Sequence, residues 1–151
     1  MANEQLKYGW LFGGIVGTVW PIGASEVISA QSGRFVKLDG SGRLEIAVDG
    51  STELVGHLDC EAQTASATEG ATVAFCNFSL DAVYRIPVNS GTYVATMRGK
   101  TCDLSVSSSI QGAQLDASAE DTVVIVDGDV TNNNFVDVIL NPGKRMQTGV
   151  V

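Results

Sequence analysis

Residues 35–58 read FVKLDGSGRLEIAVDGSTELVGHL and carry the pattern that decides the fold. Two apolar runs, residues 35–38 and 44–48, each stop at an Asp-Gly pair, and a third run, residues 52–58, alternates between apolar and polar positions. An Asp-Gly pair supplies the positive φ that a tight hairpin turn requires. These runs therefore predict three short strands in a meander.

The same pattern continues to the end of the chain, where short β-branched runs alternate with turn residues and no long run has helical spacing. The additional predicted strands are residues 73–78, 83–88, 93–97, 102–106, 123–126 and 135–140. This spacing predicts an all-β fold, a single sandwich or barrel of about nine or ten short antiparallel strands. We expect an extended N-terminal arm at residues 1–26, a β domain at 27–141 and a C-terminal tail at 142–151.

Composition restricts the classes of partner. The chain has 151 residues, of which 44% are hydrophobic and 17% are charged, below the usual quarter for charged residues. Low charge favours an apolar surface that lies against a protein partner. The net charge of −8 repels phosphate backbones, and no basic stripe compensates for it, so nucleic acid is not an expected partner.

The N-terminal segment contains the least common feature of the sequence. Residues 10–22 read WLFGGIVGTVWPI and carry no charge, but a membrane span needs about 20 apolar residues, so no membrane partner is expected. Large apolar side chains are costly to expose to water. They form the domain's own first strands or bind a neighbouring subunit or shell, and both alternatives stay open. The candidate capsid- or subunit-binding residues are Trp10, Leu11, Phe12, Ile15, Val16, Val19 and Trp20.

Catalytic and metal-binding patterns are weak. His57 is the single histidine, so any triad would have to use it. Three scattered cysteines, Cys60, Cys76 and Cys102, do not supply a zinc site, and their odd number indicates buried thiols in a reducing compartment. We expect no catalytic residue, no cofactor, no metal and no enzyme activity.

Two short motifs are the nearest that the sequence has to a metal site or an enzyme. Asp127 and Asp129, followed by the three asparagines 132–134, resemble a calcium loop, but the EF-hand pattern is not met, so a hairpin turn is predicted. Residues 102–104, CDL, are similar to part of the first motif of trimeric dUTP pyrophosphatases. The catalytic tyrosine segment and the closing tail of that family have no counterpart here, so we reject that assignment.

A family resemblance runs through about residues 30–141. It rests on a central strand, a Gly-Thr segment, a Gly-Lys turn, an Asp-Leu strand and an acidic bend before the last strands: AVYRIPV at 82–88, Gly91, Gly99-Lys100, Asp103-Leu104, Asp116 and the strand at 123–127. In this pattern the chain resembles the head decoration, or capsid cement, proteins of tailed bacteriophages. The resemblance implies a small β domain, often a homotrimer, made in the host cytoplasm. Such a domain binds the outer capsid surface of the virion and cements contacts between major capsid proteins.

Two other functions remain as alternatives. A carbohydrate- or receptor-binding β-sandwich needs exposed aromatic side chains on one face, whereas most aromatic residues of the body lie at predicted core positions. A tail or baseplate adaptor shares the features of a capsid cement. Binding to phage heads or to tails distinguishes a capsid cement from such an adaptor.

Overall fold

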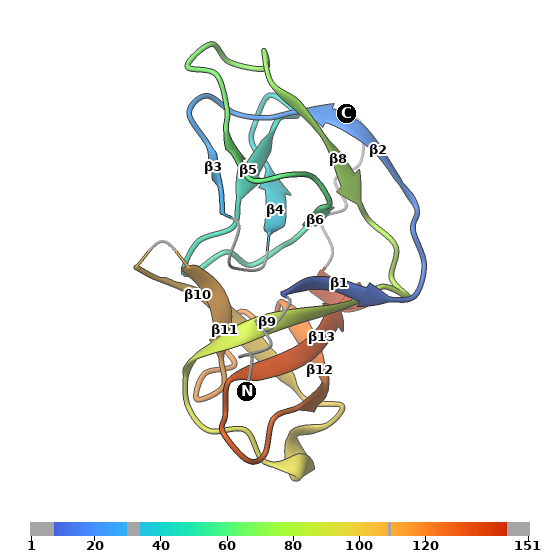
Figure 1. Cartoon of the computed structure of the whole chain (residues 1–151), viewed down its shortest axis with the longest axis vertical. Coiled ribbons are helices and arrows are strands. Elements are labelled where there is room, and N and C mark those ends of the chain that lie inside the picture. Colours follow the sequence, from blue (N-terminus) through green and yellow to red (C-terminus); the bar gives the residue numbers. More distant parts are fainter. Residues whose placement is uncertain (1–7, 30–33, 109, 145–151) are drawn as a thin grey trace, which may run out of the picture.

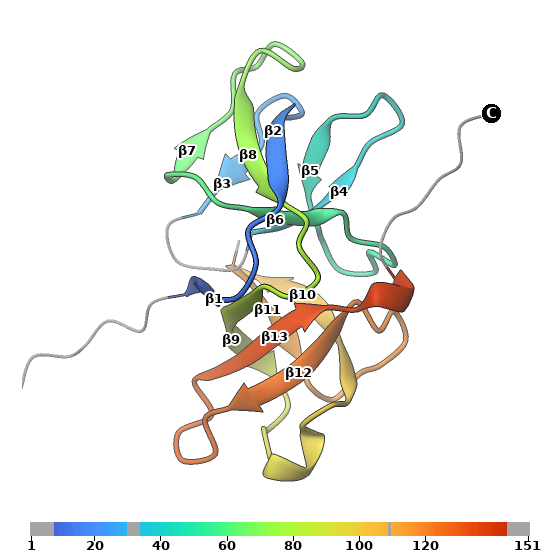
Figure 2. The same ribbon diagram turned by 90° about the vertical axis from the view of Figure 1, so that its right-hand side faces the viewer.

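The computed structural model of the chain describes residues 8–29, 34–108 and 110–144. Strands make up 47% of the residues and the described parts contain no α-helix, which confirms the all-β prediction. The described residues form thirteen strands where nine or ten were expected. They are arranged in two lobes along the long axis of the molecule (Figures 1 and 2).

The lobe formed mainly by the C-terminal half is a sheet that closes on itself. Strand β9 pairs with β13, β13 with β12, β12 with β10, β10 with β11, and β11 returns to β9 in a short parallel pairing. Such a circuit leaves few unpaired strand edges. The strands are β9 (Val83–Ser90), β10 (Thr101–Ser107), β11 (Ile110–Gln114), β12 (Val123–Gly128) and β13 (Phe135–Leu140). The larger of two buried apolar clusters fills this lobe.

The other lobe is a five-stranded sheet in the order β2-β8-β6-β4-β5. A parallel bridge between Ile22 and Leu44 links the chain after β2 to β5, and both side chains belong to the second buried cluster. The strands are β2 (Gly17–Pro21), β4 (Phe35–Leu38), β5 (Leu44–Ile46), β6 (Gly56–Leu58) and β8 (Val73–Asn77). A two-stranded sheet of β3 (Val27–Ile28) and β7 (Gln63–Thr64) adds to this lobe.

The predicted meander is wrong in one pairing. Strands β4 and β5 form the expected hairpin, in which the Asp39 carboxylate accepts hydrogen bonds from the N–H groups of Ser41 and Arg43 at 2.7 and 2.9 Å. Strand β6, however, pairs with the far edge of β4. The third run therefore lies next to the first run and not next to the second, and all three residues of β6 are buried there.

A second correction concerns residues 93–97, which were predicted as a strand. They contain the 3₁₀ helix η1 (Ala95–Met97), while a second one, η2 (Pro142–Lys144), follows β13. Tyr93 is buried just before η1, and its N–H donates to the Asn133 side chain at 2.8 Å. The Asn133 side chain thus accepts the Tyr93 N–H, which in a strand would donate to the backbone of a neighbouring strand.

The two lobes meet at an aromatic and polar junction. The rings of His57 and Tyr84 stack with centroids 4.0 Å apart, and the Phe35 ring lies edge-on to both, at 5.1 and 5.4 Å. Gln111 of β11 is buried, and its side-chain amide bonds the backbone of the other lobe. It accepts from the N–H of Phe35 at 2.8 Å and donates to the carbonyls of Phe35 and Ala47 at 3.0 Å. Gln111 thus substitutes for a strand neighbour between the lobes.

The segment before Pro21 belongs to both lobes. Strand β1 (Gly9–Phe12) pairs with β9 in one lobe, and β2 pairs with β8 in the other. Figure 1 shows this blue segment passing along one side of the molecule from β1 to β2. Residues 9–12 and 17–21 of the predicted arm are therefore paired through their backbone with the body, while residues 1–7 of it lie outside the described residues. In the described residues no helix is long and apolar enough to cross a membrane.

Candidate functional site

The predicted binding residues of the N-terminal segment divide into two groups. Leu11 and Trp20 are half-buried, and the Trp20 ring stacks on Phe78 at 5.7 Å. The other five are exposed by 44–61% of their surface although each is a large apolar side chain. We call these five the apolar strip: Trp10, Phe12, Ile15, Val16 and Val19.

Glycines hold the strip close to the body. Gly13 has a φ of +100°, in the left-handed region, and a β-carbon there would overlap the carbonyl oxygen of Asp81. A β-carbon on Gly17 would overlap the carbonyl oxygen of Cys76. Glycine is required where the backbone approaches another chain segment this closely. Glycines at these two positions therefore allow the backbone of the segment to pack closely against the body.

Asn77 fixes the turn between β1 and β2. Its buried side chain accepts from the N–H of Val16 at 3.3 Å and donates to the carbonyl of Gly14 at 3.3 Å, while the N–H of Phe78 donates to the carbonyl of Val16 at 2.8 Å. These bonds satisfy the backbone of the segment without covering its side chains. The strip is consequently held in position before any partner binds, which lowers the entropic cost of binding.

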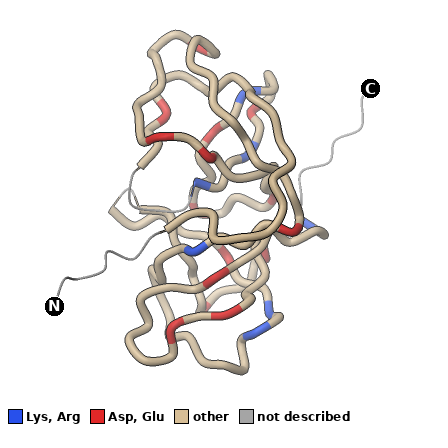
Figure 3. Tube along the Cα trace, turned by 45° about the vertical axis from the view of Figure 1, so that its right-hand side comes forward, with Lys and Arg blue, Asp and Glu red and all other residues tan. Residues whose placement is uncertain are grey.

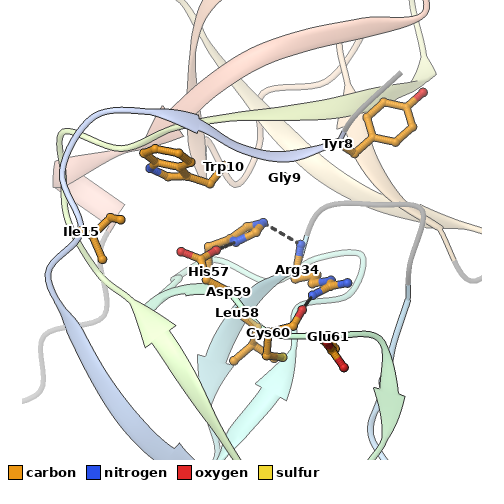
Figure 4. Close-up of a pocket in the computed structure, with 10 residues that line it drawn as sticks. All are labelled: Tyr8, Gly9, Trp10, Ile15, Arg34, His57, Leu58, Asp59, Cys60 and Glu61. Carbon is orange, nitrogen blue, oxygen red and sulfur yellow. Dashed lines mark hydrogen bonds and ion pairs between the residues drawn. The ribbon is translucent and has the colours of Figure 1, made fainter. Parts of the chain in front are cut away.

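A pocket of about 490 Å³ opens beside the strip. Figure 4 shows β1 on one side of it, with Trp10 facing His57, and the chain after β6 on the other side. The lining residues are Tyr8, Gly9, Trp10, Ile15, Arg34, His57, Leu58, Asp59, Cys60 and Glu61. Two strip residues therefore line the pocket as well, and the pocket and the strip form one continuous surface.

His57 lies in the pocket wall as a buried, fully bonded histidine. Its Nε2 accepts from the Arg34 backbone N–H at 3.1 Å, so Nδ1 carries the proton and donates to the Asp59 carboxylate at 2.8 Å. Burial lowers the pKa of His57, because desolvation of the charged ring outweighs the attraction of Asp59. This geometry orients Asp59 and leaves no nitrogen of the ring available as a base.

This histidine predicts a pH dependence of stability. The unfolded chain takes up a proton near pH 6.5, whereas native His57 has a lowered pKa and stays neutral, so its contribution is complete above pH 6.5 and is lost as pH falls toward the folded pKa. As pH falls below 6.5, the free energy of unfolding should fall by up to about 1.4 kcal/mol per pH unit. Urea unfolding of the parent and of His57→Gln measures it. The free energy of unfolding of His57→Gln should depend less on pH below 6.5 than that of the parent. An equal pH dependence in the two proteins would contradict the role given to His57.

The carboxylates of the acidic turn after β12 are bonded to backbone N–H groups and to an arginine. The Asp129 carboxylate accepts from the N–H groups of Thr131, Asn132 and Asn134 at 3.1 to 3.3 Å, and Asp127 pairs with Arg98 at 3.0 Å. The turn joins the antiparallel strands β12 and β13, as the predicted hairpin requires. In the part of the chain that the structure describes, no group of three or more His, Cys, Asp or Glu could hold a metal.

Charge is spread over both lobes. Figure 3 shows acidic and basic positions in both lobes of the described trace. The three cysteines are thiols that form no disulfide, and burial raises the pKa of Cys102 to about 12. No protein-family model, no curated protein sequence and no solved structure matches the chain.

Proposed function

We propose that this chain is a structural virion protein that binds the outer surface of a phage capsid and cements contacts between major capsid proteins. The observation that carries the proposal is the apolar strip, whose five large side chains are exposed while its backbone is fixed. Several large exposed apolar side chains close together in the sequence of a folded domain are typical of a protein-binding site. Aromatic side chains, here Trp10 and Phe12, are enriched at the centres of such interfaces.

The capsid as the partner is supported by the sequence resemblance. The resembling positions from Ala82 to Asp127 fall largely in the closed sheet, where they form strands and turns. We extend the proposal to a homotrimer with cyclic closure, the arrangement that the resemblance implies. Many copies on a rigid lattice bind by avidity, so a strip of modest area per copy is sufficient for stable decoration.

Binding to purified particles tests the proposal. The chain should sediment with empty heads of the phage that carries its gene, saturate at a fixed number of copies per head, and raise the temperature at which the heads open. It should not sediment with isolated tails. Saturable binding to tails with none to heads would contradict the capsid assignment and favour the adaptor alternative.

A further inference from the structure

The pocket beside the apolar strip has the size and position of an anchor site. At about 490 Å³ it lies within the range of roughly 300–1,000 Å³ that is typical of ligand pockets. Trp10 and Ile15 belong both to its lining and to the strip. A protein that covers the strip therefore also covers the mouth of the pocket.

The charges of the pocket favour a cation. Asp59 and Glu61 contribute two carboxylates, and among the described lining residues Arg34 is the single basic side chain. The Arg34 guanidinium is already engaged, because Nε donates to the carbonyl of Ser29 at 2.9 Å and Nη1 donates to the carbonyl of Cys60. The two carboxylates thus outnumber the one guanidinium, and two donors of that guanidinium are directed to backbone carbonyls.

Trp10 and Asp59 supply complementary parts of a cation site. Figure 4 shows the Trp10 ring on one side of the pocket and the Asp59 side chain, next to His57, on the other. The His57 Nδ1–H holds one Asp59 oxygen at 2.8 Å and fixes the carboxylate. Indole is the aromatic ring that attracts cations most strongly, and a fixed carboxylate adds a charge-assisted hydrogen bond.

We propose that this pocket receives a lysine or arginine side chain of the partner protein, inserted between the Trp10 ring and the Asp59 carboxylate. The aliphatic part of that side chain lies against Ile15 and the ring, and its charged end reaches Asp59, with Glu61 adding negative charge at the rim. The inference rests on the proposed function, since it names a chemical feature of the partner. A partner with an overall positive contact surface also fits the net charge of −8.

The two tryptophans of the chain allow a direct test by NMR. In ¹⁵N-labelled full-length protein, Trp10 and Trp20 each give one indole N–H signal, and Trp20 lies outside the pocket lining. The probes are the Nα-acetyl N-methylamides of lysine, arginine and norleucine. The lysine and arginine probes should shift the Trp10 signal saturably, at least about fivefold more tightly than the norleucine probe. The Trp20 signal should stay unchanged.

Asp59→Asn provides the matching variant. Asparagine still accepts the His57 N–H, so the fold is retained, which the Trp20 signal and the thermal melt verify. Binding of the lysine probe should weaken at least about fivefold, whereas Glu53→Gln, at an exposed carboxylate outside the pocket lining, should have no effect. Equal binding of the norleucine probe, or unchanged binding in Asp59→Asn, would overturn the proposal. If the parent chain binds none of the charged probes but still sediments with heads, the pocket proposal alone is refuted. If it binds the charged probes but does not sediment with heads, the capsid function alone is refuted.

Discussion

Replacing Phe12, Ile15 and Val16 together by serine should reduce the affinity for heads at least about 100-fold, because buried apolar anchors at an interface centre contribute about 2 kcal/mol or more each. The same change should leave the thermal melt within a few degrees of the parent's, since the three side chains are 57–61% exposed in the free protein. Head binding by sedimentation and melting by circular dichroism measure the two effects.

A matched control lies in the other part of the chain. Val94, Val126 and Val130 are also exposed apolar side chains, at 37–62%, and they lie around η1, β12 and the turn after β12. Their triple replacement by serine should leave head binding unchanged. If this control lost binding and the strip variant retained it, the contact surface would have to be assigned to the lobe of the closed sheet.

Gln111→Leu should destabilise the chain by about 2–5 kcal/mol, because it leaves the N–H of Phe35 and the C=O of Ala47 without their partner. The C=O of Phe35 loses one of its two hydrogen bonds and keeps the one from the N–H of Ala47. Each unsatisfied buried group costs about 1–3 kcal/mol. The free energy of unfolding of a typical domain is about 5–15 kcal/mol, so the loss should be evident in a urea unfolding curve.

Gln114→Leu is the control for this change, since Gln114 ends the same strand and is half-buried. It should alter the free energy of unfolding by less than about 1 kcal/mol. Similar losses in the two variants would show that the effect belongs to the strand and not to the bridge between the lobes.

Local patterns predicted most of the strands. The Asp-Gly turns and alternating runs placed β4, β5, β8, β9, β10, β12 and β13 near their observed positions. Strand β11 was missed because its run, IQGAQ, is interrupted by Gly112 and lacks β-branched residues after Ile110. The glycine is required by packing, since a β-carbon there would overlap the Asn89 side chain and the carbonyl oxygen of Pro87. Such a requirement comes from a segment more than twenty positions away.

The division into two lobes could not be predicted for a related reason. The pairing of β9 with β11 and β13, and the bond from Gln111 to Phe35 across 76 positions, depend on contacts that have no local signature. Sequence patterns alone would assign Gln111 to the surface, because glutamine is mostly exposed.

The candidate site was predicted in part. Hydrophobicity identified the seven residues of the N-terminal segment, and two alternatives were left open for them, core strands or a contact with a neighbour. The structure combines features of each: the backbone of β1 and β2 pairs with the body, while five side chains remain exposed. The pocket was not predicted, because it joins Trp10 to residues 57–61 through the fold.

Hydrogen exchange of the head-bound chain tests whether the apolar strip contacts the head, because it compares the same amides free and bound. Binding through the apolar strip should slow exchange chiefly in residues 9–21, with little change around the turn at 129–134. Slowed exchange at that turn, with residues 9–21 unchanged from the free protein, would contradict this contact.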